Sequence, residues 1–340
     1  MNASKKCVTL TTVNPPTAAV HAFIASDFDV IIAGDRKTPD DYRALDCTFL
    51  DLRAQHAQFP TLAKQLPVDS YARKNLGYLY AIRNGYTLIA ESDDDNLPGE
   101  NWGALPRRFT RAVTAPAYPN MYSLYTDARI WPRGFPLDKI AAAVDATNAT
   151  DATDATETIR IEKQTGVPFI VQALADGDPD VDAIHRLVFG AGGIAFNAGD
   201  YLLARNVLSP FNSQNTFWLN RAAFAFLYLP ATVPFRCCDI LRGYVAQYGI
   251  WARGGRLAFT GPSVRQARNP HDYLDDFASE MPLYLDFHKI MTALDAVDLN
   301  GDDNDLRALY RQLHRAGFVD AFELQLVDAW LEQLASCAPA

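Results

Sequence analysis

The chain has 340 residues, enough for one large domain or two modest ones, and its 49% hydrophobic and 21% charged residues are typical of a globular protein with a substantial core. A net charge of -9 and the lack of a polybasic run argue against a nucleic-acid-binding surface. The sequence shows no long apolar run and no basic-then-apolar leader, so we expect no transmembrane segment, no export and a cytoplasmic location.

The first ninety or so residues alternate between strand and helix patterns. A β-branched strand is expected at residues 7–13, followed by a helix opened by Pro15. Further strands are expected at residues 29–33 and 48–52. This βαβα order predicts a parallel sheet with helices on its faces.

A helix is expected over residues 69–84, with Asp69 or Ser70 as its cap. Its first turn carries Arg73 and Lys74, whose positive charges oppose the helix dipole at a cost of roughly 0.3–1 kcal/mol each. Both residues are therefore candidates for contacting a phosphate. The alternative is a pair of solvated surface cations.

An acidic run, residues 91–96, reads Glu-Ser-Asp-Asp-Asp-Asn and follows an apolar stretch that predicts a buried strand. Adjacent carboxylates repel one another, and such clusters often bind Mg²⁺ or Mn²⁺ shared with substrate phosphates. Ligands in open α/β sheets bind beyond the carboxyl ends of the strands. The run therefore indicates a metal-bound nucleoside diphosphate, with a solvated acidic turn as the alternative.

The second half of the chain opens with residues 144–158, a repeated Asp/Asn-Ala-Thr unit that predicts a mobile surface insertion. We expect a strand at residues 167–171, a glycine-rich strand pair around residues 190–193 and a helix over residues 220–229. The tail, residues 303–336, has the spacing of a packed helical pair.

Asp239 is a second candidate site residue, predicted to cap a helix over residues 240–248. A capping carboxylate is also held rigidly enough to accept a proton from an attacking hydroxyl. The vicinal Cys237 and Cys238 are open to a redox role, but two buried inert thiols are the stronger expectation.

Three further segments carry polar candidates. Asp180 and Asp182 lie on the same side of an extended chain, where they either orient acceptor hydroxyls or decorate a turn. Arg133, in a stiff aromatic segment, suits phosphate or carboxylate recognition, unless it is an ordinary exposed arginine. The polar run at residues 211–216 either binds a sugar or forms a turn. His271 sits in a loop context that suits a metal or diphosphate site, with a solvated histidine as the alternative.

These residues resemble a known family. Residues 68–82 resemble the signature that precedes the acidic motif in STELLO-type glycosyltransferase domains, and further matches follow in family order at residues 131–137, 179–182, 210–216 and 239–244. The helical tail resembles the family's as well. A more distant similarity is to the reversibly glycosylated polypeptides, the UDP-arabinopyranose mutases.

The resemblance implies a GT-A fold of the α/β class, with a Rossmann-like nucleotide-binding half merged with an acceptor-binding half over residues 1–300 and a helical extension over residues 301–340. It also implies a nucleotide-sugar donor, foremost a UDP-sugar, a glycan or other hydroxyl acceptor, and Mn²⁺ or Mg²⁺. Arg133 aligns with the arginine that becomes glycosylated in the mutase relatives. STELLO sequences read Asp-x-Asp-Asp at the acidic run, so Glu91 and Asp93 are an alternative metal pair to Asp93 and Asp95.

The expected function is therefore a metal-dependent glycosyltransferase. The alternatives are a nucleotide-sugar mutase or a protein that glycosylates itself at Arg133, and a non-catalytic sugar-binding or scaffold protein with the same fold. The expected site comprises Asp93, Asp95 and His271 for the metal, Thr11, Thr12, Asp35, Arg73, Lys74 and Asp94 for the donor, Asp180, Asp182, Asn212, Asn215 and Arg242 for the substrate, and Asp239 and Arg133 for catalysis.

Overall fold

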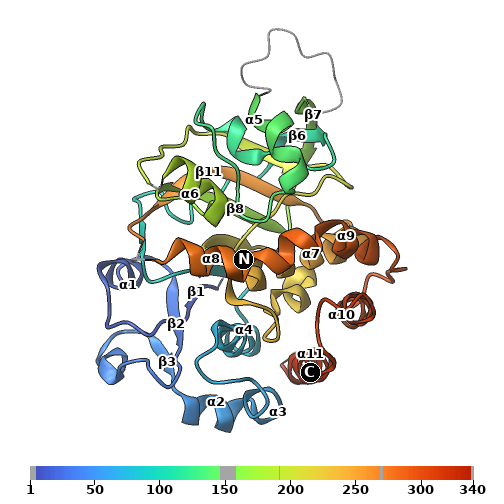
Figure 1. Cartoon of the computed structure of the whole chain (residues 1–340). Helices are drawn as coiled ribbons and strands as arrows, with labels where there is room; N and C mark the ends of the chain where they lie inside the picture. The colour runs from blue at the N-terminus through green and yellow to red at the C-terminus, as the bar shows by residue number, and fades with distance from the viewer. Residues whose placement is uncertain (1–4, 146–157, 191, 269–270, 338–340) are drawn as a thin grey trace.

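The computed structural model describes residues 5–145, 158–190, 192–268 and 271–337. One 11-stranded sheet runs through the molecule in the order β3-β2-β1-β4-β10-β8-β11-β9-β6-β7, with β5 paired to β11. Helices lie on both sides of this sheet (Figure 1). Most of the expected insertion at residues 144–158 lies outside the described residues.

The first half of the sheet is parallel, as the βαβα order predicts. β1 pairs with both β2 and β4, and β2 pairs with β3, all in parallel. Alternate side chains of β1 and β2 point to opposite faces, so Val8 and Ile32 pack with α1 while Cys7 and Ile31 belong to the core under α4. The elements are β1 (Lys6–Leu10), α1 (Ala18–Ile24), β2 (Asp29–Ala33), η1 (Asp40–Ala44), β3 (Thr48–Leu50), α2 (Leu52–Gln58), α3 (Pro60–Ala63), η2 (Tyr71–Arg73), α4 (Lys74–Arg83) and β4 (Leu88–Ser92).

The second half of the sheet is mixed. β10 lies antiparallel between β4 and β8, β11 runs parallel to β8, and β9 is antiparallel to β11. The parallel half thus continues without a break into a mixed half, which is the merged α/β arrangement expected of a GT-A fold. The strands are β5 (Asn96–Pro98), β6 (Phe109–Ala115), β7 (Arg160–Gly166), β8 (Ile170–Gly177), β9 (Asp200–Leu203), β10 (Asn215–Trp218) and β11 (Leu257–Gln266).

The helices of the second half pack on this sheet and on one another. The helical pair expected in the tail is confirmed: α10 and α11 contact each other, and α11 also lies beside α4 (Figure 1). These elements are η3 (Met121–Leu124), η4 (Leu137–Lys139), α5 (Ile140–Asp145), α6 (Ala183–Phe189), η5 (Arg221–Leu227), α7 (Phe235–Ala252), α8 (Tyr273–Leu285), α9 (Phe287–Asp295), α10 (Asn304–Arg315) and α11 (Ala321–Ser336).

Several local expectations need correction. The predicted strand pair around residues 190–193 is absent from the described residues, where Gly190, Gly192 and Gly193 have φ of 84°, 82° and 75°, outside the φ range of regular strands. The expected helix over residues 220–229 is the 3₁₀ helix η5. Asp239 is not a cap: α7 begins at Phe235, directly after Pro234, so Asp239 lies within the helix.

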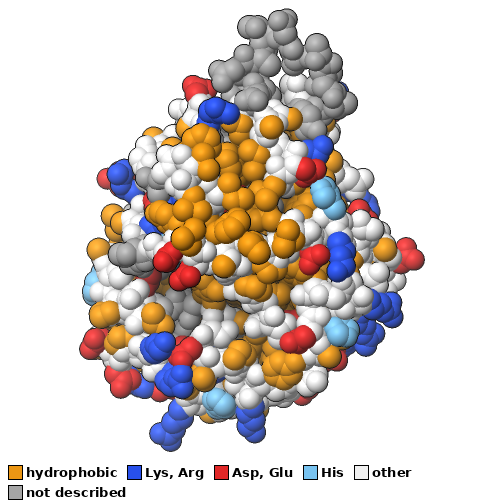
Figure 2. Space-filling view, viewed as in Figure 1, with side chains coloured by type: hydrophobic (Ala, Val, Ile, Leu, Met, Phe, Trp, Pro, Cys, Tyr) orange, Lys and Arg blue, Asp and Glu red, His pale blue; other side chains and the backbone are white. Residues whose placement is uncertain are grey.

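Three further observations concern the surface, the helices and the buried cysteines. Apolar side chains gather on the face that carries α6 and α8 (Figure 2), where Val188 is 65% and Leu285 77% exposed. None of the described helices is both long and apolar enough to span a membrane. Cys237 and Cys238 are free and buried, as expected of inert thiols, and burial raises the pKa of Cys237 to about 11.

Candidate active site

A cavity of about 390 Å³ lies where the carboxyl ends of β1, β2 and β4 meet the second half of the sheet. This is the position expected for a ligand in an open α/β sheet. The predicted site residues that line it are Thr11, Thr12, Asp35, Asp93, Asp94, Asp95, Arg133, Asp180, Asn212, Asp239 and His271.

One end of the cavity is formed by the loops that follow β1 and β2. Thr11 Oγ1 donates to the carbonyl of Ala33 at 2.7 Å and so ties the two strand ends together. Asp35 is held by the backbone N–H groups of Arg36 and Ser70, at 2.7 and 2.9 Å. This end therefore presents hydroxyl and carboxylate oxygens on a fixed backbone.

Asp94 joins that end of the cavity to the acidic run. Its carboxylate accepts hydrogen bonds from Thr12 Oγ1 and from Asn14 Nδ2, the latter at 2.9 Å. Asp94 is 8% exposed. Its Oδ2 accepts both hydrogen bonds and so holds the loop after β1 in place, and the residue also lines the cavity.

Asp93 and Asp95 face the cavity on either side of Asp94. Asp93 Oδ1 accepts a hydrogen bond from Tyr71 Oη at 2.9 Å and lies 3.3 Å from Lys74 Nζ, while its side chain keeps 32% exposure. Asp95 accepts from Gln266 Nε2 at 3.2 Å. Burial raises the pKa of Asp93, and burial together with the charge of Asp93 raises the pKa of Asp95 to about 6. Two carboxylates held in this way favour a nearby cation.

Glu91, the alternative metal ligand, points away from the cavity. It is fully buried, and both its oxygens lie 3.0 Å from Arg242 Nη1, with further hydrogen bonds from Trp218 Nε1 and Tyr78 Oη. Successive strand residues face opposite sides, and this alternation along β4 directs Glu91 into the core. Arg242, expected to bind substrate, is instead the buried partner of this carboxylate.

The two cations expected near the phosphates have different surroundings. Arg73 is fully buried and donates to Gln55 Oε1 and to the carbonyl of Leu66, so it braces the loop before η2 instead of reaching the cavity. Lys74 is also buried, but its Nζ donates to the carbonyl of Ser92 at 2.8 Å and lies beneath Asp93. Only Lys74 of the pair places its charge at the acidic run.

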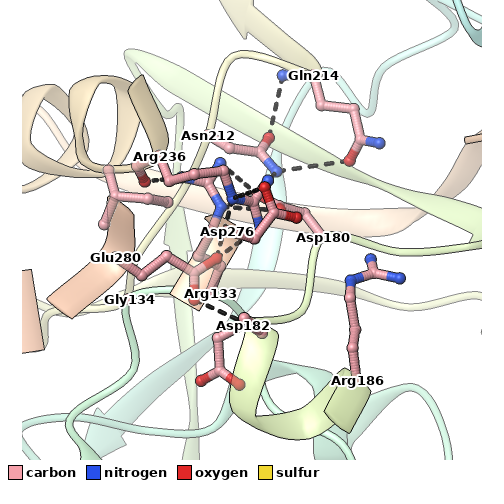
Figure 3. Close-up of polar contacts among 12 residues, drawn as sticks. Arg133, Gly134, Asp180, Asp182, Arg186, Asn212, Gln214, Arg236, Asp276 and Glu280 are labelled. Atoms are coloured by element: carbon pink, nitrogen blue, oxygen red, sulfur yellow. Dashed lines mark hydrogen bonds and ion pairs between the residues drawn. The ribbon is translucent and has the colours of Figure 1, made fainter. Parts of the chain in front are cut away.

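The opposite wall of the cavity is organised around Arg133 (Figure 3). Its Nε and Nη2 donate to Asp180 at 2.9 and 2.8 Å, and its Nη1 and Nη2 donate to Asp239 at 2.9 and 3.0 Å. The remaining Nη1 hydrogen goes to the carbonyl of Arg236. All five N–H groups of the guanidinium are thereby used.

The charges on this wall stabilise one another. Burial acts to lower the pKa of Arg133, but Asp180 and Asp239 outweigh it and hold that pKa well above its ordinary value. Burial likewise acts to raise the pKa of Asp180, and Arg133 and Arg236 outweigh it, so this carboxyl stays ionised. Asn212 Nδ2 donates to Asp180 at 2.7 Å and completes the cluster.

Two expected substrate contacts have structural roles instead. Asp182 caps α6, accepting from the His185 N–H at 2.7 Å, and also accepts from Trp131 Nε1 at 2.6 Å. It does not line the cavity beside Asp180, because the chain enters α6 at this residue. Asn215 lies in β10, where it accepts from Trp102 Nε1 and donates to the carbonyl of Leu174.

His271 lines the cavity, with its Nδ1 3.2 Å from Asp276 Oδ2. Within the described part of the chain, no group of three or more His, Cys, Asp and Glu residues is arranged as a metal centre. Asp93, Asp95 and His271 therefore do not form a preassembled three-ligand site. Any ion held by the two aspartates needs oxygens from a ligand or from water to complete its shell.

Sequence reasoning missed part of the lining. Tyr71 lies within residues 68–82, a segment predicted to be mostly helical, where a tyrosine is expected to pack in the core and not to line a cavity. Phe235 and Arg236 precede Asp239 by one turn of α7, a relation that becomes visible only once the helix is known to begin at Phe235. The lining residues outside the predicted site are Val13, Asn14, Lys37, Asp69, Ser70, Tyr71, Gln214, Phe235, Arg236, Gln266 and Arg268.

The fold and the cavity define an α/β protein with an acidic ligand site at the carboxyl edge of its parallel strands. The chain is 26% identical over 355 residues to the probable glycosyltransferase STELLO2 of Arabidopsis thaliana, covering 97% of this chain and 45% of STELLO2. It is also 26% identical to the probable glycosyltransferase STELLO1 of the same plant, covering 97% of this chain and 44% of that protein. The resemblance to STELLO-type glycosyltransferases is thereby confirmed, and the chain spans less than half the length of these relatives.

Family models and solved structures add little to this similarity. No protein-family model matches the chain. Among solved structures, S. aureus TarS in complex with UDP-GlcNAc is similar with a TM-score of 0.36 and 12% identity, covering 98% of this chain and 82% of the TarS chain.

Proposed function

We propose that this protein is a metal-dependent glycosyltransferase that moves a sugar from a nucleoside-diphosphate sugar, foremost a UDP-sugar, to a hydroxyl acceptor. The observation that carries the proposal is the cavity itself, which has Asp93 and Asp95 on one wall and Asp239 on the other. The similarity of nearly the whole chain to two probable glycosyltransferases supports it.

The donor would lie along the parallel half of the sheet. Thr11, Asn14 and Asp35 offer hydroxyl, amide and carboxylate groups suited to the hydroxyls and base of a nucleoside. Lys74 is too deeply buried to reach a phosphate, so its role is to offset the charge of Asp93 from below. The diphosphate would then lie against Asp93 and Asp95.

The donor atoms at this point fit Mn²⁺ or Mg²⁺. Asp93 and Asp95 supply carboxylate oxygens, the ligands these ions prefer, and the raised pKa of both groups reflects an unfavourable negative charge that a cation relieves. When bound, the ion supplies charge neutralisation for the departing nucleoside diphosphate. Asp93 and Asp95 alone would leave the coordination shell of the ion incomplete, as expected for a site shared with a diphosphate.

Asp239 is placed to act as the base. The acceptor hydroxyl would give its proton to the Asp239 carboxylate while the acceptor oxygen bonds to the anomeric carbon and the bond from that carbon to the diphosphate breaks. Arg133 fixes the orientation of Asp239 through two hydrogen bonds and so acts as a positioning residue.

Self-glycosylation at Arg133 is disfavoured by the same geometry. A nucleophilic guanidine must lose a proton, whereas the pKa of Arg133 is held well above its ordinary value and its five N–H groups are all engaged. Intact mass after incubation with donor tests this point. A hexose or pentose added to the chain and lost in Arg133→Lys would establish self-glycosylation.

The donor site is tested by thermal shift with nucleoside diphosphates and UDP-sugars, in Mn²⁺ and in EDTA. Binding to the native state stabilises it by about 2.7 kcal/mol at a hundredfold excess over Kd. We expect a Mn²⁺-dependent shift with one nucleotide class. Asp95→Asn should lose the Mn²⁺ dependence, whereas Asp41→Asn, a change at an exposed aspartate outside the cavity, should keep it.

Two outcomes of this experiment would change the assignment. If Glu91→Gln lost the Mn²⁺ dependence while Asp95→Asn kept it, the metal pair would be Glu91 and Asp93. A wild-type protein that shows no shift with any nucleotide would overturn the proposed function.

The base assignment has its own test. Asp239→Asn should retain the nucleotide-dependent shift and lose sugar transfer, because the amide keeps the shape of the side chain but cannot accept the proton. A weakened donor shift in this variant would make Asp239 a donor contact instead.

A further inference from the structure

Phe235 stands out in the cavity because it is a large apolar side chain among polar ones. It is the first residue of α7, and its side chain is 58% exposed, although nearly all of α7 that follows is buried. Apart from Val13 and Tyr71, the other residues that line the cavity carry hydroxyl, amide, imidazole or charged groups. An exposed aromatic ring at such a place is suited to contact a ligand.

Tyr71 fixes the orientation of this ring. The two ring centroids are 5.4 Å apart with an interplanar angle of 84°, so Tyr71 covers at most one face of Phe235. Tyr71 is itself anchored: its Oη donates to Asp93 at 2.9 Å and accepts from Lys74 Nζ at 2.9 Å. At least one face of the exposed Phe235 ring, which lines the cavity, is therefore left uncovered by Tyr71.

The free face of Phe235 lies close to the proposed base. Phe235 and Asp239 are four residues apart in α7, which places both side chains on the same side of the helix, about 6 Å apart along its axis. That span is comparable to a pyranose ring. A ring stacked on Phe235 would bring one of its hydroxyl groups to the Asp239 carboxylate.

The chemistry of these groups matches a sugar. A pyranose has apolar C–H faces, which pack on aromatic rings, and a rim of hydroxyls, which bind amides and carboxylates. Gln214, Gln266 and Asp180 line the same cavity and supply such groups. The nucleoside end, near Thr11 and Asp35, is formed by different loops.

We infer that Phe235 is the stacking platform of the acceptor subsite, and that the acceptor is therefore a carbohydrate. This inference rests on the proposed function, since it assigns the acceptor of the same transfer reaction. It makes Phe235 a binding residue for the acceptor and leaves donor binding to Thr11, Asn14, Asp35, Asp93 and Asp95.

The test compares Phe235→Ala and Phe235→Trp with Phe322→Ala, a change at another exposed phenylalanine near a helix start, outside the cavity. The probes are short neutral gluco-, xylo-, galacto- and manno-oligosaccharides, observed by proton NMR with protein, UDP and Mn²⁺. We expect ring-current shifts of the sugar C–H protons in the wild type, their loss in Phe235→Ala and their retention in Phe235→Trp and in Phe322→Ala.

Kinetics gives the second readout, with the UDP-sugar that produces the largest thermal shift as donor. Phe235→Ala should raise the acceptor KM about tenfold, an effect in the range of single aromatic stacking contacts, whereas Phe322→Ala should leave the acceptor KM unchanged. The melting temperature of Phe235→Ala without ligand should stay close to that of Phe322→Ala, because Phe235 is 58% and Phe322 40% exposed.

These experiments distinguish a failure of the Phe235 inference from a failure of the proposed function. If Phe235→Ala weakens the nucleotide-sugar thermal shift, the ring contacts the donor, and the inference is wrong while the proposed function stands. If the wild type binds nucleotide but no oligosaccharide, the carbohydrate acceptor is also wrong. If the wild type binds no nucleotide, the proposed function fails, and the oligosaccharide spectra recorded without UDP then decide whether Phe235 contacts sugar.

Discussion

Arg133 joins two buried carboxylates, and its removal should leave them facing each other. Arg236 is the nearest remaining cation, 3.9 Å from Asp180, and it is already paired with Glu280 at 2.7 Å. We expect Arg133→Gln to lower the free energy of unfolding by about 3–5 kcal/mol, the usual cost of breaking a buried ion pair on one side. Urea denaturation at neutral pH measures this loss.

The control for Arg133 is an exposed arginine in a similar pairing. Arg43 contacts Asp40 and Asp51 at the surface, where solvent screens the charges. Arg43→Gln should therefore leave the free energy of unfolding almost unchanged. Equal effects of the two substitutions would show that the Arg133 cluster contributes no more than a surface ion pair.

His185 should make stability depend on pH. Burial lowers the pKa of this imidazole from its ordinary 6.5, and the charge of Arg186 acts in the same direction, against Asp182 and the Arg129 carbonyl. Its Nδ1 has no hydrogen-bond partner among the described residues, so a second proton there would be unsatisfied. The unfolded chain therefore takes up a proton before the folded chain does.

Acidification should accordingly destabilise the folded state through His185. The contribution of this residue is fully present above pH 6.5 and is lost as the pH falls through its lower folded pKa. The free energy of unfolding in urea, measured from about pH 7.5 down to about pH 5, should fall with a slope that His185→Gln reduces. His21→Gln, at an exposed histidine, should leave the slope intact; a slope insensitive to His185→Gln would contradict the assignment.

At the scale of elements, the contact of α4 with the parallel strands depends on one glycine. A Cβ atom added at Gly77 would lie 2.5 Å from Thr9 Cγ2 of β1 and 3.5 Å from Ala33 Cβ of β2. The helix can approach the sheet this closely only without a side chain. Lys74 lies at the start of the same helix, so this contact also sets the position of its charge under Asp93.

Gly77→Ala should therefore have two opposing effects on the stability of the folded state. Alanine favours a helix interior by about 1 kcal/mol, whereas overpacking a tight contact costs about 1–3 kcal/mol. We expect a net loss of stability together with weaker Mn²⁺-dependent nucleotide binding, measured by urea denaturation and thermal shift. Gly99→Ala, whose nearest neighbour would be the Ser263 carbonyl at 3.4 Å, should change neither; a stabilised Gly77→Ala would contradict the close packing.

The elements that could be predicted from sequence were those with local signals. The strand at residues 29–33, the strand expected at residues 48–52, which ends at Leu50, and the tail helices follow from apolar periodicity, which is a property of neighbouring residues. The region around Gly190 could not be predicted this way, because its backbone is set by positive φ values and not by side-chain alternation. The predicted start of α7 was about one turn too late. The helix begins directly after Pro234, whereas the polar Asp239 has the residue type of a cap.

At the scale of the whole molecule, most of the residues predicted for the site do line the cavity. The sequence could not, however, distinguish charged side chains at the surface from buried ones. Arg73, Asp182 and Arg242 have the residue types of ligand contacts, yet each bonds to a partner far along the chain: Gln55, Trp131 and Glu91. Such pairings depend on tertiary packing, which a single sequence does not reveal. The strand pattern and the acidic motif predicted where the cavity lies, and long-range pairing decides which side chains enter it.

The C-terminal helices share their core with the rest of the molecule. Trp330 of α11 is fully buried and its Nε1 donates to the carbonyl of Ala225 at 2.9 Å. Glu323, also buried, accepts from the Tyr228 hydroxyl and from the backbone N–H of Thr232, the latter at 2.7 Å. Helix α11 therefore closes the same apolar core that contains α4 and α7.

A shared core predicts that α10 and α11 unfold together with the sheet. Trp330→Ala should lower the free energy of unfolding by about 3–5 kcal/mol, because it opens a large cavity and removes a hydrogen bond. Phe322→Ala, on the same helix but at a 40% exposed ring, should cost much less. Urea denaturation followed by both tryptophan fluorescence and far-UV circular dichroism should give coincident transitions in the wild type and in both variants. An early, separate transition shifted only by Trp330→Ala would instead show that residues 301–340 form an independent extension.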